Sequence, residues 1–247
     1  MTIKFSPVAV LLLCSILMAC GGGGAGGTGT SAVTQSESAD GIWTGTTVTP
    51  GYGTSSTVAF FNGGEFIAIN ENFYEFYKGS YNIDGSRIRA NNAKGYEVNG
   101  PYLGSGDLDG VVYSQGTLRA TVNSALGNSE LDLVYETAAY EQSISLADLT
   151  GSWSGSIPGL SFGINISSSG YFTASASDGC NVSGQLSIPR TNRNMITADL
   201  TISGSNCFVS GNYSGLGILV DDVLAKDTLL FGYANNNYGF AYAAYRN

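Results

Sequence analysis

Two cysteines, Cys180 and Cys207, carry the clearest indication of chemistry in this sequence. In a secreted chain, two cysteines that close a loop of about 28 residues are expected to form a disulfide, worth about 3.6 kcal/mol of unfolding free energy. A reactive thiol pair is the alternative, but the chain has no Cys-x-x-Cys motif and no cation close in sequence to either thiol. We therefore predict a structural disulfide, whose reduction lowers stability and leaves binding through the first half of the chain unchanged.

Carboxylates form two short clusters, Asp107 with Asp109 and Asp221 with Asp222, each beside flexible sequence. Calcium binds such oxygen ligands, but the twelve-residue loop with a terminal glutamate is absent, so we interpret both clusters as solvated loops. The chain contains no histidine, which excludes Ser-His-Asp and Cys-His catalytic devices and every histidine-ligated metal. We predict no catalytic residue, no metal and no cofactor, and therefore that the protein is not an enzyme.

Aromatic residues are concentrated in one stretch of the first half. Five of them lie between Phe73 and Tyr81, and the alternation of a strand would turn some of them outward. Tyrosine offers a large contact area at low entropic cost, so we predict an exposed row that binds protein or glycan, formed by Tyr74, Tyr77 and Tyr81. The alternative interpretation is a strand buried on both faces, in which these aromatics belong to the core.

The elements that would position these residues begin with a repeated motif. Gly-x-Trp-x-Gly occurs at residues 41–45 and again at 151–155, and it contains the two tryptophans of the chain. In each half a Gly-x-Phe segment then follows. We interpret this order as a duplicated unit of about 100 residues, with domains at residues 40–141 and 142–247 that fold independently. One large sandwich is the alternative.

Strand patterns are clearest in the second half. Residues 160–166 alternate between apolar and small or polar side chains, which is typical of a half-buried strand, and residues 196–202 repeat the pattern. Counting in this way predicts eight short segments between Ser152 and Tyr245, and one helical turn near residues 146–149. A meander of eight antiparallel strands closes into a small up-and-down barrel, so we predict an all-β fold of two tandem barrels of about eight strands each. Filled interiors are expected for barrels of this size, which favours binding on loops and outer faces.

The Gly-x-Trp start, the alternating strands and the tight turns resemble the lipocalin and avidin families of up-and-down barrels. In those families the tryptophan closes the narrow end of the barrel, so the resemblance implies a structural role for Trp43 and Trp153. A platform on which a sugar stacks is the alternative for the two rings. The segment Ser210–Tyr213 is similar to the Ser-Gly-x-x-Tyr loop of barrel lysozyme inhibitors, and it is one residue shorter.

The chain starts with a pattern typical of a secretory leader. Lys4 precedes an almost wholly apolar run at residues 8–18, and a run of about 11 residues is too short for the roughly 20 that span a bilayer. Leu17-Met18-Ala19-Cys20 resembles the lipobox of bacterial lipoproteins, in which the leader is cut before a cysteine that becomes the lipidated first residue. The resemblance implies that residues 1–19 are a signal peptide and that Cys20 carries the membrane anchor.

Residues 20–39 are predicted to form a flexible tether, because a run of glycines is followed by a Ser/Thr-rich stretch. Gly21 stands where inner-membrane lipoproteins usually carry aspartate. That resemblance implies the outer membrane, on its periplasmic face or at the cell surface. Three acyl chains, as found in that family, would make the attachment effectively permanent.

Charge limits the partners of the chain. Ten Lys and Arg against nineteen Asp and Glu give a net charge of −9, which repels nucleic acid. We predict a non-enzymatic, lipid-anchored binding module of the bacterial envelope that captures a protein or a small ligand. An inhibitor or immunity protein against a hydrolase is one alternative, and a structural envelope lipoprotein is another. A barrel cavity would favour a ligand carrier, whereas a rigid loop that plugs a cleft would favour an inhibitor.

Overall fold

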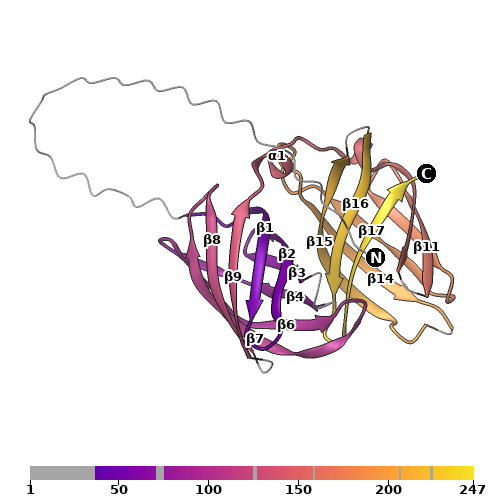
Figure 1. Ribbon diagram of the computed structural model, residues 1–247. Coiled ribbons are helices and arrows are strands. Elements are labelled where there is room, and N and C mark those ends of the chain that lie inside the picture. Colours follow the sequence, from indigo (N-terminus) through magenta and orange to yellow (C-terminus); the bar gives the residue numbers. More distant parts are fainter. Residues whose placement is uncertain (1–36, 71–74, 125–126, 158, 206, 223–224) are drawn as a thin grey trace, which may run out of the picture. The chain divides into compact units, whose positions relative to one another are not determined.

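The computed structural model describes residues 37–70, 75–124, 127–157, 159–205, 207–222 and 225–247. The predicted leader, Cys20 and most of the predicted tether lie outside these residues, and so does Tyr74. Apart from two short helical turns, the regular structure of the described chain is strand (Figure 1). The fold is all-β, as predicted, and it contains a closed antiparallel barrel.

The strands divide into two groups at the helical turns α1 (Thr137–Tyr140) and α2 (Leu146–Leu149), of which α2 is the predicted turn. The first half contains β1 (Gly41–Thr49), β2 (Gly53–Asn62), β3 (Glu65–Asn70), β4 (Glu75–Ser80), β5 (Asn82–Asp84), β6 (Arg87–Glu97), β7 (Gly100–Val112), β8 (Thr117–Ser124) and β9 (Gly127–Tyr135). The second half contains β10 (Gly151–Ile157), β11 (Leu160–Ile166), β12 (Tyr171–Ala176), β13 (Asn181–Ser187), β14 (Ile196–Ser203), β15 (Gly211–Asp222), β16 (Ala225–Ala234) and β17 (Tyr238–Arg246). Within the described ranges, no helix has the length and apolar character needed to cross a membrane.

The strands of the first half close on themselves. β1 lies between β2 and β9 and pairs with both (Figure 1), and the other strands pair largely in chain order. β4 and β5 both pair with β6, so the closed barrel is eight strands around. We refer to β1–β9 as the N-terminal barrel.

The strands of the second half follow the same meandering order. β10 to β17 each pair with their neighbours in the chain. β10 also pairs with β17, where Trp153 lies opposite Arg246 and Ser154 opposite Tyr245. The eight segments predicted between Ser152 and Tyr245 correspond to these strands, which we call the C-terminal ladder.

Alternating burial accounts for the strands of this ladder. In β14, every second residue from Ile196 to Ile202 is buried, and the residues between them are exposed or half-buried. β11 alternates as well, but its inward residues Leu160 and Phe162 are only half-buried. The difference arises because these two side chains line a cavity.

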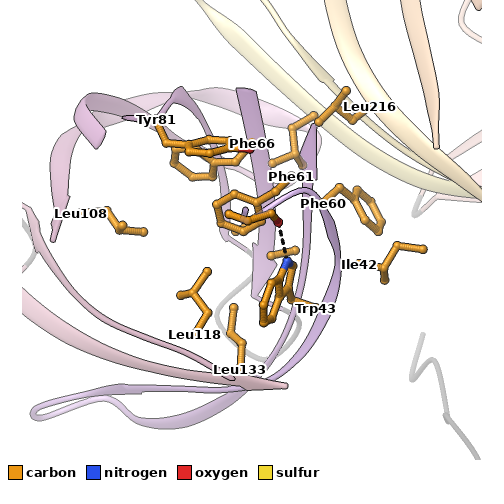
Figure 2. Close-up of a cluster of buried hydrophobic side chains, with 14 of the residues drawn as sticks. Ile42, Trp43, Phe60, Phe61, Phe66, Tyr81, Leu108, Leu118, Leu133 and Leu216 are labelled. Carbon is orange, nitrogen blue, oxygen red and sulfur yellow. Dashed lines mark hydrogen bonds between the residues drawn. The ribbon is translucent and has the colours of Figure 1, made fainter. Parts of the chain in front are cut away.

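The repeated tryptophan makes the same contact in both halves. Trp43 Nε1 donates to the Ala39 carbonyl at 2.8 Å, and Trp153 Nε1 donates to the Leu149 carbonyl at 2.9 Å. Both rings are fully buried, and Figure 2 shows Trp43 with this hydrogen bond among the side chains of the N-terminal barrel. The bond satisfies the indole N–H, which would otherwise be costly to bury.

The second glycine of each motif has no room for a side chain. A Cβ at Gly45 would lie 2.1 Å from the carbonyl oxygen of Asp132, and a Cβ at Gly155 would lie 2.5 Å from that of Ala243. Asp132 belongs to β9 and Ala243 to β17, the last strand of each half. The glycine therefore allows the first and last strands of each half to approach each other closely.

Cys180 and Cys207 form the predicted disulfide, with their Cα atoms 5.0 Å apart. Cys180 precedes β13 and Cys207 precedes β15, so β14 lies between them. The turn after β14 brings them together: a Cβ at Gly204 would lie 3.3 Å from Cys207 Cβ and 3.5 Å from Cys180 Cα. Gly204 has a positive φ of 143°, which favours glycine at this position.

A buried apolar surface joins the two halves within one compact unit, Gln35–Asn247. Successive residues of a strand point to opposite faces, and the residues after Phe60 and Phe76 point into the N-terminal barrel. Phe60 and Phe76 therefore point out of the barrel, yet both are fully buried. Leu216 and Ile218 of β15 belong to the same apolar cluster. Figure 2 shows Phe60 on the opposite face of its strand from Phe61.

Aromatic rings of the N-terminal barrel pack against glycines of the C-terminal ladder. A Cβ at Gly232 would lie 2.6 Å from Phe76 Cε2, and a Cβ at Gly239 would lie 2.6 Å from Tyr96 Cγ. Nearby, the Lys78 ammonium donates to Ser214 O and Oγ, each at 2.6 Å, and burial lowers the pKa of Lys78. Either half alone would expose this surface to water, so we expect the halves to stabilise each other.

Candidate ligand-binding cavity

The interior of the C-terminal ladder contains a cavity of about 440 Å³. Its walls are mostly aliphatic and aromatic side chains that point inward from the strands. Representative members are Phe162, Ile164, Phe172, Val182, Ile202 and Phe240. The volume lies within the range of small-molecule sites, about 300–1,000 Å³. The predicted filled interior is therefore wrong for this half of the chain.

The cavity lies toward one end of the ladder. Its lining includes Leu160 at the start of β11, Asp178 in the β12–β13 turn, Phe208 just before β15 and Tyr238 at the start of β17. In an antiparallel meander these turns share one end, which is opposite the end where Trp153 enters β10. We call this the open end.

Trp153 and Arg246 occupy the opposite end. The Arg246 guanidinium carbon lies 4.2 Å from the centroid of the Trp153 ring, and its Nη1 donates to the Thr150 carbonyl at 2.9 Å. The fully buried ring thus has a cation on its face and presents no free surface on which a sugar could stack. The structural role that the resemblance implies for Trp43 and Trp153 stays a prediction.

Two inward glycines of the C-terminal ladder lie against the rings of Phe162 and Phe172. Gly155 lies directly opposite Phe162 and Gly184 directly opposite Phe172 in the paired strands. A Cβ would come within 2.4 Å of the Phe162 ring and 2.8 Å of the Phe172 ring. Each ring therefore covers the backbone of the neighbouring strand.

One position of the N-terminal barrel carries a larger side chain than its counterpart in the C-terminal ladder. Tyr77 lies opposite Ala68 on its neighbouring strand, and Val182 lies opposite Ala174 in the same way. The Tyr77 side chain fills space inside the N-terminal barrel, whereas the smaller Val182 side chain leaves the corresponding space in the C-terminal ladder empty. The void between the inward side chains of the N-terminal barrel is about 30 Å³, so the predicted filled interior is confirmed there.

Hydrogen-bonded polar side chains also fill the N-terminal barrel. Thr57 Oγ1 donates to Asn70 Oδ1 at 2.7 Å and lies 2.6 Å from Thr47 Oγ1. All three residues are buried. Their mutual hydrogen bonds satisfy polar groups inside the barrel and tie together β1, β2 and β3.

Few polar groups reach the cavity. Tyr233 and Tyr242 line it, and Asp178 is the only charged side chain among its described lining residues. Burial raises the pKa of Tyr233 well above its usual value, and the nearby Tyr242 adds to this. Burial also raises the pKa of Tyr242. Both tyrosines therefore remain neutral hydroxyls at physiological pH.

A turn of the N-terminal barrel reaches the open end. Asn99 and Pro101, at the β6–β7 turn, line the cavity, and Pro101 pairs with Tyr238 of β17. Phe208 is 78% exposed, and its ring centroid lies 6.3 Å from that of Tyr238. The rim of the cavity is therefore built from both halves and presents an exposed aromatic ring.

The predicted binding tyrosines are not an exposed row. Tyr81 is 8% exposed and its hydroxyl donates to Asp40 Oδ1 at 2.7 Å. Tyr77 is half-buried inside the N-terminal barrel, and its hydroxyl donates to Glu75 Oε2 at 2.6 Å. Tyr74 lies outside the described residues. Phe76 of the same stretch does point outward, but the C-terminal ladder covers it.

The carboxylate clusters have local roles where they are described. Arg87 Nε donates to Asp109 Oδ1 at 2.8 Å. Hydrogen bonding from Arg87 holds the pKa of Asp109 below its usual value. Asp107 Oδ1 accepts from the Asn92 N–H at 2.8 Å. The side chains of residues 221 and 222 lie outside the described set. Among the described residues, no group of three or more His, Cys, Asp or Glu is placed to hold a metal ion.

The Ser210–Tyr213 segment does not project as a loop. Tyr213 is 4% exposed, and its hydroxyl donates to the Val209 carbonyl at 2.6 Å. Ser210 Oγ donates to the Cys207 carbonyl at 2.7 Å. The tyrosine side chain therefore anchors the disulfide-bonded loop and is not offered to a partner.

Sequence reasoning missed the residues of the cavity. Gly155 and Gly184 occupy inward positions of their strands, but the filled N-terminal barrel has the same feature, with Gly79 opposite Phe66. A glycine at such a position lets an aromatic ring from the neighbouring strand cover its backbone. Because this pattern occurs in both halves, it does not identify the cavity; the difference is Val182, where the N-terminal barrel has Tyr77.

No protein-family model, curated protein or solved structure matches this chain.

Proposed function

We propose that the protein is a non-enzymatic binding module made of two tandem up-and-down barrels with different roles. The C-terminal ladder forms the second barrel and holds a small apolar ligand. The N-terminal barrel is filled, packs beside it and adds the β6–β7 turn to the rim. The observation that carries this proposal is the apolar cavity of about 440 Å³, compared with about 30 Å³ inside the N-terminal barrel.

The cavity favours a ligand carrier over the other candidate functions. A structural envelope protein needs no internal space, and interiors are normally packed as densely as crystals of small molecules. An inhibitor needs a rigid projecting loop, whereas Tyr213 of the Ser210–Tyr213 segment is buried. An unfilled cavity lined by apolar groups is what a carrier of small apolar molecules requires.

Filling the cavity with a larger side chain should weaken the binding of a small apolar ligand. Ala174 of β12 lines the cavity, and we expect Ala174→Phe to lower the affinity for N-phenyl-1-naphthylamine at least about tenfold, because the added ring occupies the ligand's space. This neutral probe becomes fluorescent in apolar surroundings, so a titration of residues 28–247 measures its binding.

Thr173→Phe is the matched control, since Thr173 precedes Ala174 on the same strand and is exposed. The control should bind the probe as the unmodified protein does. Near-ultraviolet circular dichroism would establish that both variants are folded. Equal affinities for the two folded variants would overturn the assignment of the cavity as the binding site.

We also propose that the binding module is attached to the outer membrane through lipid on Cys20, as the lipobox resemblance implies. Replacing Cys20 by serine should move the protein from the detergent phase to the aqueous phase in detergent partitioning, because the acyl chains are lost. Cys14→Ser, within the leader, is the control and should leave partitioning unchanged. Continued partitioning of the Cys20 variant into detergent would contradict the anchor.

A further inference from the structure

Two tyrosines on adjacent strands line the cavity. Tyr233 of β16 and Tyr242 of β17 have ring centroids 5.6 Å apart, and Tyr233 is 8% exposed. Among the described residues, neither hydroxyl has a hydrogen-bond partner. Four other buried tyrosines each donate to a protein oxygen: Tyr81, Tyr96, Tyr135 and Tyr213. The buried Tyr140 hydroxyl, which does not line the cavity, also has no hydrogen-bond partner among the described residues.

An unpaired hydroxyl in an apolar wall is unfavourable, because the group loses its hydrogen bonds to water without replacement. A ligand oxygen placed against the pair would restore those bonds. A neutral phenol can both donate and accept, so a hydroxyl, a ketone or an ester would each satisfy it. A pure hydrocarbon would leave both groups unpaired.

The charges around the cavity oppose an anionic ligand. No Lys or Arg is among its described lining residues, and Asp178 at the open end is acidic. The described arginines of the same half are engaged elsewhere: Arg246 stacks on Trp153, Arg190 pairs with Asp40 and Arg193 lies near Glu141. A carboxylate inside this wall would be buried without a counter-ion, which is strongly unfavourable.

We propose that the cavity selects neutral oxygenated hydrocarbons, such as alcohols, ketones or esters, and that Tyr233 and Tyr242 bind the ligand's oxygen inside the barrel. This inference rests on the proposed function and adds the chemical class of the ligand. It assigns the aliphatic and aromatic wall to the hydrocarbon part and the tyrosine pair to the single polar group. The apolar body sets affinity, and the tyrosines set discrimination.

A competition experiment with ligands of equal chain length tests the proposal. Decanol, methyl decanoate, decanoate and decane would each displace N-phenyl-1-naphthylamine from residues 28–247 at neutral pH. Decanol and methyl decanoate should compete at least about tenfold more strongly than decanoate. They should also compete about fivefold more strongly than decane, the effect of one net hydrogen bond.

The double variant Tyr233→Phe/Tyr242→Phe retains both rings and removes both hydroxyls. It should bind decane and the probe within about twofold of the unmodified protein, while its preference for decanol over decane disappears. A preference that survives in the folded variant, or decanoate that competes as well as decanol, would overturn the proposal while leaving the cavity as a site for apolar ligands. If neither the probe nor decane binds the unmodified protein, the proposed function itself fails.

Discussion

Replacing Phe76 by alanine is expected to lower the free energy of unfolding by about 3–5 kcal/mol. Its side chain is fully buried, and it lies between the two halves, where Gly232 and Gly239 of the C-terminal ladder approach its ring. The ring also packs with Tyr96 at a centroid distance of 5.7 Å. Because glycines cannot fill the space left by the ring, the loss includes a cavity as well as the transfer of apolar surface. Urea unfolding would measure it.

Phe208→Ala is the matched control for this experiment. Phe208 is 78% exposed, so its removal should change the free energy of unfolding by no more than about 0.5 kcal/mol. Equal and small effects of the two substitutions would contradict the contact between the halves. Two separate unfolding transitions, neither of them shifted by Phe76→Ala, would instead support halves that fold independently.

Replacing Cys180 and Cys207 together by alanine is expected to lower the unfolding free energy by about 3.6 kcal/mol and to weaken ligand binding as well. Cys180 itself lines the cavity, and so do Phe208 and Val209, which follow Cys207. The disulfide ties this loop to the start of β13, so its loss frees part of the cavity wall. The sequence predicted a change in stability alone, because binding was assigned to the first half.

Two measurements separate the effects of the disulfide on stability and on binding. Urea unfolding gives the stability of the double variant, and titration with N-phenyl-1-naphthylamine, under conditions where the variant is folded, gives its affinity. Reductant should weaken binding to the unmodified protein and have no effect on the double variant, which serves as the control. Unchanged affinity in the folded double variant would show that the loop is not part of the binding wall.

The features that were predictable from sequence are local or depend on a short pattern. Alternation with a period of two identified β11 and β14, since each strand has one face toward an apolar interior. The disulfide followed from two cysteines that close a loop of about 28 residues in a chain with the pattern of a secretory leader. The paired Gly-x-Trp-x-Gly motifs marked the start of each half, and both tryptophans donate to the carbonyl four residues before them.

The cavity and the contact between the halves depend on which residues meet across strands, which no single segment reveals. Gly155 matters because register places it opposite Phe162. Phe76 looks like a surface aromatic in its own strand and is buried because Gly232 approaches it from the other half. The aromatic stretch was therefore interpreted as a surface for a partner. The cavity lies instead in the other half, where Val182 stands at the position of Tyr77.

The most direct test of the account is a crystal structure of residues 28–247 grown with decanol. The account predicts one decanol molecule inside the C-terminal ladder, its chain against Phe162 and Phe172 and its hydroxyl within hydrogen-bond distance of Tyr233 or Tyr242. Decanol bound only on the outer surface, with the interior of the ladder closed by its own side chains, would contradict the central claim that this barrel is a ligand carrier.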